Sequence, residues 1–181
     1  EALGRPNENG LAVAIGTKAD GMYDRLDPRQ QLIARRILLR LVQFGEGRHD
    51  TRRQVSEDLL GAQEFSNDDV RSVVEILIEN RLLTASVPHR SQETHKKQRL
   101  IDISHEVLIQ SWPRLRSWIL KMKDAEKIRR RLEDRANIWA NEGQKRGSLD
   151  KYELMDAQQW LKTSDAKKLG ASATLLELVD K

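Results

Sequence analysis

His105 and Glu106 open the segment HEVLI, which begins like the zinc-protease pattern H-E-x-x-H. That pattern needs a second histidine four residues after the first, so that both imidazoles face one zinc ion. Ile109 stands at this position, which excludes the zinc-protease interpretation. His89 and His95 lie in a polar stretch without a set of carboxylates or cysteines around them, and the sequence contains no cysteine at all. We therefore expect no metal site.

The patterns that bind phosphates or supply a nucleophile are also missing. The segment GEGRHDTR has glycines, but it lacks the lysine and the strand-to-helix context of the phosphate loop G-x-x-x-x-G-K-[ST]. No G-x-S-x-G segment occurs. We expect that this chain alone is not an enzyme, has no catalytic residue and binds no cofactor.

Composition and charge limit the class of protein further. Of the 181 residues, 38% are hydrophobic and 33% are charged, which is typical of a helix-rich chain that still buries a core. No apolar run approaches the roughly 20 residues that span a bilayer, and no signal peptide opens the chain. We expect a cytoplasmic protein without membrane contact. Because the sequence begins at Glu1 without a methionine, we also expect it to be part of a longer polypeptide.

The elements that would position His105 follow from the spacing of apolar residues. Helical spacing runs from Gly10 to Leu26, and Asp27-Pro28 is a cap-and-proline signal for a second helix. Ser56 is expected to open a short helix, and Ser66 or Asn67 a longer one. Two strand-like runs follow, Leu82–Val87 and Leu100–Ile103. They flank the polar segment PHRSQETHKKQR, which we call the hairpin tip. This order is typical of a winged helix, so the predicted fold is mainly α with a small β-hairpin.

Beyond the hairpin, the pattern predicts a long helical arm and a helical C-terminal region. Ser104 is expected to cap a helix from His105, which Pro113 should break or kink near Trp112. The arm then runs to about Asn141, and we expect its segment RRRLEDR to be a solvated helix face. A final helix is expected over 149–161, capped by Ser148. The apolar stripe of the arm consists of Leu115, Ile119, Met122, Ile128, Leu132, Ala136 and Trp139.

Most winged helices that bind DNA insert their third helix into the major groove, where it approaches phosphates. Here that helix carries Asp68, Asp69, Glu75 and Glu79 against the single Arg71, a poor match to a polyanion. We expect DNA binding to be weak and confined to the hairpin tip, whose basic residues are Arg90, Lys96, Lys97 and Arg99.

Several stretches together resemble the bacterial novel STAND NTPases, which are signal-transduction ATPases related to plant disease-resistance and animal apoptosome proteins. They are GMYDRLDPRQQLIARRILLRLVQFGEGRHDTRRQV, VVEILIENRLLT, LIDISHEVLIQSWPRLRSWI, RRRLEDRANIWANEG and SLDKYELMDAQQWL. The resemblance covers about Ala12 to Leu161. It implies a parent protein with an upstream ATPase module that binds ADP or ATP with Mg²⁺, and a downstream sensor or repeat region in the same polypeptide.

The resemblance also implies a role for the residues that follow the hairpin. Related proteins carry a Met-His-Asp motif there, and Ser104, His105 and Glu106 occupy its place. The family's histidine bonds the β-phosphate of ADP and stabilises the closed state. This implies a nucleotide-dependent switch, with possible oligomerisation on activation. The domains expected are 1–26, a helix joining from the upstream module, 27–112, the winged helix, and 113–181, the arm and C-terminal helices.

Three alternatives remain open from the sequence. The chain could be a DNA-binding winged-helix regulator, or a helical scaffold for a protein partner. His105 could also be a packed residue between helix and hairpin rather than a nucleotide contact. The sequence does not identify the upstream effector, the downstream sensor, the triggering ligand or the oligomeric state.

Overall fold

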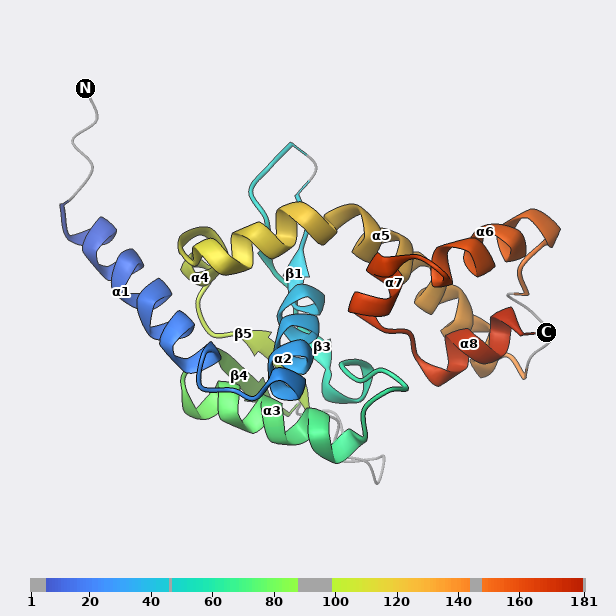
Figure 1. Ribbon diagram of the computed structural model, residues 1–181, viewed down its shortest axis with the longest axis horizontal. Coiled ribbons are helices and arrows are strands. Elements are labelled where there is room, and N and C mark those ends of the chain that lie inside the picture. Colours follow the sequence, from blue (N-terminus) through green and yellow to red (C-terminus); the bar gives the residue numbers. More distant parts are fainter. Residues whose placement is uncertain (1–5, 46, 88–98, 144–147, 181) are drawn as a thin grey trace. The chain divides into compact units, whose positions relative to one another are not determined.

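The computed structural model describes residues 6–45, 47–87, 99–143 and 148–180 (Figure 1). These residues form eight α-helices, one 3-10 helix and two small antiparallel sheets, which confirms the predicted, mainly α fold with a small β component. The chain divides into two compact units. The first contains residues up to Leu60 together with Asn67–Lys121, and the second contains Gly61–Ser66 together with the residues from Met122 onward.

In the first unit, α2 begins where the sequence predicts, whereas α1 begins four residues before the expected Gly10. Helix α1 spans Pro6–Tyr23 and α2 spans Pro28–Arg40. The Asp27 side chain accepts a hydrogen bond from the Gln30 backbone N–H at 2.8 Å, and the Gln30 side chain accepts one from the Asp27 N–H at 3.1 Å. Pro28 supplies the first helical residue, whose missing N–H costs nothing there. The predicted restart at Asp27-Pro28 is confirmed.

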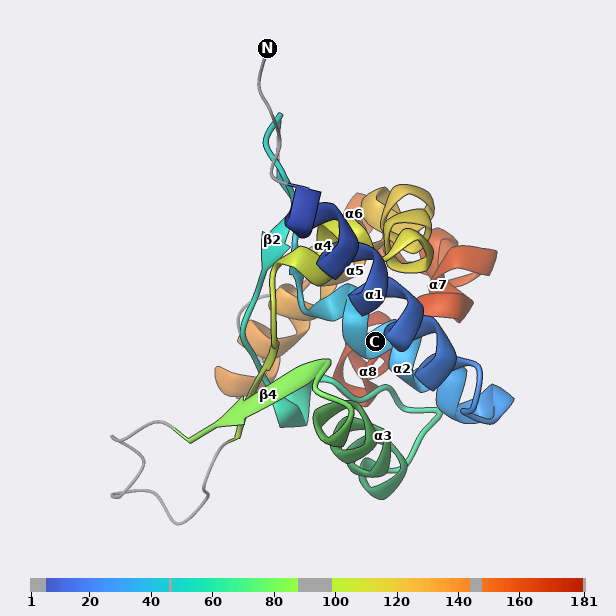
Figure 2. The ribbon, with the colours of Figure 1, turned by 90° about the vertical axis from the view of Figure 1, so that its left-hand side faces the viewer.

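A three-stranded antiparallel sheet follows, with β5 (Leu100–Ile103) between β3 (Val55–Ser56) and β4 (Leu83–Ser86). Leu83 pairs with Ile103, and Val55 pairs with Ile101. The sequence between these strands holds the 3-10 helix Glu57–Leu59 and α3 (Asn67–Glu79), and Figure 2 shows β4 beside α3. A two-stranded sheet pairs β1 (Val42–Gln43) with β2 (Thr51–Arg52). The predicted short helix, longer helix and hairpin are observed in this order.

The core of the first unit joins α2, α3 and the sheet. Its side chains are aliphatic and at most 1% exposed: Ile37, Leu38, Leu41, Val74, Leu77, Ile101 and Ile103. Fully burying one such side chain contributes about 1.5–3 kcal/mol, before the loss of conformational entropy is counted. This core fixes the end of β5, from which the candidate site begins.

Beyond the sheet, α4 (Val107–Ser111) ends at Trp112, whose backbone is extended at φ −92° and ψ 102°. Pro113 then begins α5 (Pro113–Asn141), a helix of 29 residues. The predicted break at Trp112-Pro113 is confirmed, because the residue before a proline avoids the helical conformation. Gly16 of α1 lies against this break: a Cβ atom added there would lie 2.9 Å from the carbonyl oxygen of Ser111. Figure 2 shows α1 running past α4.

The second unit contains the α5 residues from Met122 onward, with α6 (Lys151–Leu161), α7 (Ser164–Leu169) and α8 (Ala173–Val179). Two predictions here are wrong in detail. Asp150, not Ser148, caps α6. The Asp150 carboxylate accepts a hydrogen bond from the backbone N–H of Glu153, and the Glu153 carboxylate accepts one from the backbone N–H of Asp150. Ile128 is 37% exposed, although the apolar stripe predicted its burial.

Candidate functional site

Ser104, His105 and Glu106 form the turn between β5 and α4. The Ser104 backbone N–H donates to the carbonyl of Leu82 at 3.0 Å. The Ser104 hydroxyl donates to the carbonyl of Arg81 at 2.6 Å, and Arg81 has a left-handed φ of 61°. Ser104 therefore ties the turn to the loop before β4 and does not cap a helix, contrary to the prediction. The carbonyl of Arg81, distant in sequence but adjacent in space, accepts the hydrogen bond of the hydroxyl instead.

The side chains of His105 and Glu106 are both exposed. Helix α4 begins at Val107, two residues later than predicted, and it is five residues long. The carbonyls of His105 and Glu106 accept hydrogen bonds from the N–H groups of Leu108 and Ile109, each at 3.0 Å. The backbone of the turn is thus fixed on both sides while the imidazole points away from the interior. A His105 side chain packed in the core does not match this exposure.

The far end of α4 is held by a carboxylate of α1. Asp20 accepts a hydrogen bond from the Trp112 indole N–H at 2.7 Å and pairs with the Arg114 guanidinium at 2.8 Å. Arg114 also pairs with Asp24 at 2.8 Å. Burial by itself would lower the pKa of Arg114, but the hydrogen bond to Asp24 and the charges of both aspartates raise it. One helix turn of α1 therefore binds the end of α4 and the beginning of α5 together.

An aromatic cluster lies at the same junction. The ring centroids of Tyr23 and Trp118 are 5.0 Å apart, and those of Trp112 and Trp118 are 5.6 Å apart. The Arg114 guanidinium lies over the Tyr23 ring, 4.8 Å from its centroid. Burial raises the pKa of the Tyr23 phenol, partly offset by the charges of Arg35 and Arg114. Such pairs add about 0.5–1.5 kcal/mol each beyond the area they bury.

Among the predicted nucleic-acid contacts, only Arg99 lies within the described residues; Arg90, Lys96 and Lys97 lie outside them. The Arg99 guanidinium pairs with Glu75 of α3 at 2.6 Å and with Glu57 at 3.5 Å. The hydrogen bond to Glu75 raises the pKa of Arg99. In this structure Arg99 joins the hairpin to α3 through carboxylates.

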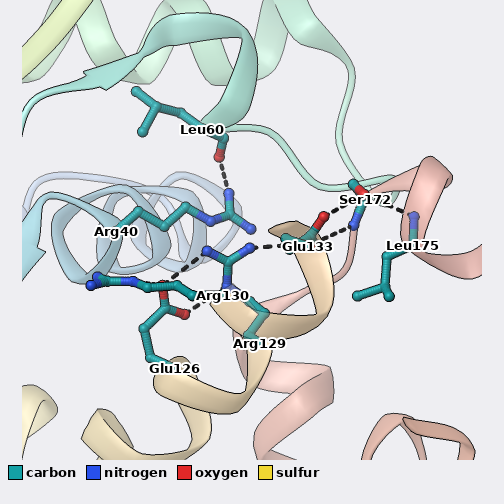
Figure 3. Close-up of polar contacts among 8 residues, drawn as sticks. All are labelled: Arg40, Leu60, Glu126, Arg129, Arg130, Glu133, Ser172 and Leu175. Atoms are coloured by element: carbon teal, nitrogen blue, oxygen red, sulfur yellow. Dashed lines mark hydrogen bonds and ion pairs between the residues drawn. The ribbon is translucent and has the colours of Figure 1, made fainter. Parts of the chain in front are cut away.

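The segment RRRLEDR is only in part the solvated helix face that was predicted: Arg131 and Asp134 are exposed, but Arg129 is buried. The Arg129 guanidinium makes two hydrogen bonds to the Glu126 carboxylate, at 2.7 and 2.9 Å, and one to Glu133 at 3.3 Å (Figure 3). Glu126 is 0% exposed and Arg129 is 7% exposed. Burial by itself would lower the pKa of Arg129, but the hydrogen bond and charge of Glu126, followed by those of Glu133, raise it.

The same network reaches α8. Glu133 accepts hydrogen bonds from the Ser172 hydroxyl at 2.6 Å and from the Ser172 N–H at 3.0 Å, and the Ser172 hydroxyl caps α8 by accepting from Leu175 (Figure 3). The charges i, i+3 and i, i+4 apart were readable in the sequence. Their burial was not, because burial depends on packing against residues distant in sequence; Ser172, which bonds to Glu133, lies 39 positions away.

Within the described ranges, no three His, Asp or Glu side chains gather in a way that could hold a metal ion. No helix of this part of the chain has the length and apolar character needed to cross a bilayer. The site therefore consists of an exposed imidazole and carboxylate on a turn with a fixed backbone. Such a turn can recognise a group presented from outside, and it is connected through α4 to α1 and α5.

Of three comparisons with known proteins, one found a match. The family model described as Novel STAND NTPase 1 matches residues 6–147. Searches of the curated proteins and of the solved structures found no match. The matched range contains both sheets, the turn at His105 and all of α5, and it is most of the chain. The protein therefore belongs to the novel STAND NTPase 1 family.

Proposed function

We propose that this chain is the regulatory region of a STAND signal-transduction ATPase of the cytoplasm. The first unit acts as a winged helix that closes over ADP held by an upstream ATPase module with its Mg²⁺. Helix α5 relays the nucleotide state toward a downstream sensor region. In this proposal His105 donates a hydrogen bond to the β-phosphate of ADP, and Ser104 and Glu106 position and flank it.

The turn from Ser104 to Glu106 carries the proposal. Two hydrogen bonds from Ser104 hold the turn against the loop before β4. The exposed imidazole of His105 is therefore attached to a fixed backbone. A fixed base lowers the entropy lost when a side chain binds a ligand. The family membership supports nucleotide as that ligand, because members are nucleoside triphosphatases by name.

The relay is supported by the contacts at the other end of α4. Asp20 binds both Trp112 and Arg114, so α1, α4 and α5 share one carboxylate. The Gly16 backbone adds a close contact, because a side chain there would meet the Ser111 carbonyl. A displacement of the His105 turn would therefore act through α4 on the first residues of α5.

The test is the rate of ADP dissociation from the full-length protein, compared between wild type and His105→Ala. A hydrogen bond to a charged group is worth roughly 1.5–3 kcal/mol. Lost from the closed state alone, it shifts the closed-to-open ratio by about one to two decades. We expect faster ADP release and more spontaneous signalling. Glu106→Ala should have a smaller effect.

Gln110→Ala is the matched control, because Gln110 is exposed on α4 and close to the turn. It should leave ADP release unchanged. Equal ADP release from wild type and a correctly folded His105→Ala variant would rule out the nucleotide contact.

A further inference from the structure

The second unit contains a pocket of about 670 Å³ between the later half of α5 and α6. This volume lies within the range of roughly 300–1,000 Å³ that is typical of small-molecule sites. A large part of the lining is apolar and is contributed by Ile128, Leu132, Leu149, Ala157 and Trp160. The pocket is separate from the turn at His105, which belongs to the first unit.

The charged residues of the lining cancel one another. Arg131 and Arg135 come from α5, and Glu153 and Asp156 come from α6. Arg135 and Glu153 pair with each other at 2.9 Å. A charged ligand would bring a charge that this balanced lining does not compensate, and an uncompensated charge is costly to remove from water. The lining therefore favours a molecule without net charge.

Two hydrogen-bond donors of the lining are unused. The Nε atom of Arg135 and the Nε1 atom of Trp160 are shielded from solvent and have no acceptor among the described residues. Trp160 is only 8% exposed. Buried N–H groups are nearly always hydrogen-bonded, so two unpaired donors in side chains of one pocket indicate a missing acceptor.

We propose that this pocket binds an uncharged, largely apolar small molecule that carries a carbonyl-type oxygen. The apolar lining accommodates the body of the molecule, and the indole N–H of Trp160 donates to its oxygen. The family match ends at residue 147, before α6. The α6 wall of the pocket therefore lies outside the matched range, whereas the α5 wall lies inside it.

The probe is prodan, an uncharged naphthalene ketone whose emission shifts to the blue when it moves from water into an apolar site. Titration of the intact chain should give saturable binding with one prodan per chain. Dimethylaminonaphthalene, which lacks the ketone, and the anionic dye anilinonaphthalene sulfonate should both bind more weakly. Tighter binding of the anionic dye would overturn the assignment of an uncharged ligand, and the absence of saturable prodan binding would overturn the site.

Two variants locate the binding. Gln159→Trp places a large side chain on an exposed position of the lining and should abolish prodan binding. Met155→Trp is the matched control, because Met155 is exposed on the same helix but is not part of the lining, and it should leave binding unchanged. Circular dichroism checks that both variants remain folded. Unchanged prodan binding in Gln159→Trp would place the dye elsewhere and overturn the proposal.

Trp160→Phe tests the hydrogen bond itself. The variant keeps an aromatic ring but removes the N–H donor. Prodan should bind about two- to tenfold more weakly, because a neutral hydrogen bond contributes about that factor. Binding of the ketone-free dye should not change. An equal loss for both dyes would show that Trp160 acts by shape alone and would overturn the role of its N–H.

Discussion

Each unit contains a cluster of carboxylates and guanidinium groups, and the two clusters differ in burial. In the first unit, Asp20 pairs with Arg114, and their side chains are 38% and 31% exposed. In the second unit, Glu126 pairs with Arg129, and their side chains are 0% and 8% exposed. The same chemical groups therefore work in different dielectric surroundings. An exposed pair is screened by water, whereas a buried pair depends on both partners being present.

This difference assigns the clusters different roles. Loss of one partner at Asp20 leaves an arginine that water can solvate, so the junction of α1, α4 and α5 can rearrange at modest cost. Loss of Glu126 leaves the buried guanidinium of Arg129 with one remaining carboxylate contact, the 3.3 Å pair with Glu133. The first cluster suits a joint that moves, and the second suits a fixed anchor of α5.

The largest effect should come from Glu126→Ala. Removing one member of a buried ion pair typically costs about 3–5 kcal/mol. In this variant the Arg129 guanidinium loses both bonds to Glu126 and keeps only the 3.3 Å contact with Glu133. We expect the free energy of unfolding of the second unit to fall by this amount, measured by urea denaturation followed through Trp139 and Trp160 fluorescence in a Trp112→Phe, Trp118→Phe background. Asp124→Ala, an exposed change on the same helix, is the control and should have little effect. Similar losses in the two variants would contradict the buried-anchor interpretation.

Smaller effects on stability, of opposite sign at two glycines of α1, test the junction of α1 with α4. Gly16→Ala should destabilise the first unit by about 1–3 kcal/mol, because the new Cβ lies 2.9 Å from a backbone carbonyl that must move. Gly21→Ala has no atom within 4 Å of its Cβ and should stabilise α1 by up to about 1 kcal/mol through helix propensity. Thermal unfolding of both variants measures the signs. Stabilisation by both would show that α1 does not need its close approach to α4.

The smallest effect should be a loss of stability at alkaline pH through Tyr23. Burial raises the pKa of this phenol in the folded state, so the unfolded chain loses the phenol proton first, near pH 10. The contribution of Tyr23 is therefore complete below about pH 10 and is lost as the pH rises through the folded pKa. The difference in unfolding free energy between wild type and Tyr23→Phe should shrink above this pH. A difference independent of pH would contradict the shift.

The local signals in the sequence predicted the fold best. The cap at Asp27 and the break at Pro113 depend on residues within one helix turn, and both are present. The cap expected at Ser104 is absent because its hydroxyl finds the Arg81 carbonyl, 23 positions earlier. At α6, Asp150 followed by Glu153 three residues later was itself a capping-box signal, and it prevailed over Ser148.

The candidate site divides in the same way. The position of His105 after β5 followed from the strand pattern, and its nucleotide contact stays a prediction. The predicted domain boundaries at 26/27 and 112/113 also stay predictions. Periodicity could not find the buried Glu126 and Arg129, because it assigns charged residues to solvent and apolar ones such as Ile128 to the core. The pocket beside α6 requires two helices to be brought together, which no local pattern encodes.

The cluster of Tyr23, Trp112 and Trp118 also gives the junction of α1, α4 and α5 an intrinsic spectroscopic signal. Indole and phenol rings within 6.4 Å of one another couple their electronic transitions, and an indole hydrogen-bonded to Asp20 emits from a polar site. Near-ultraviolet circular dichroism and tryptophan emission should therefore report a rearrangement of α1 against α5 without any attached label. Any movement at this junction would therefore carry its own spectroscopic signal.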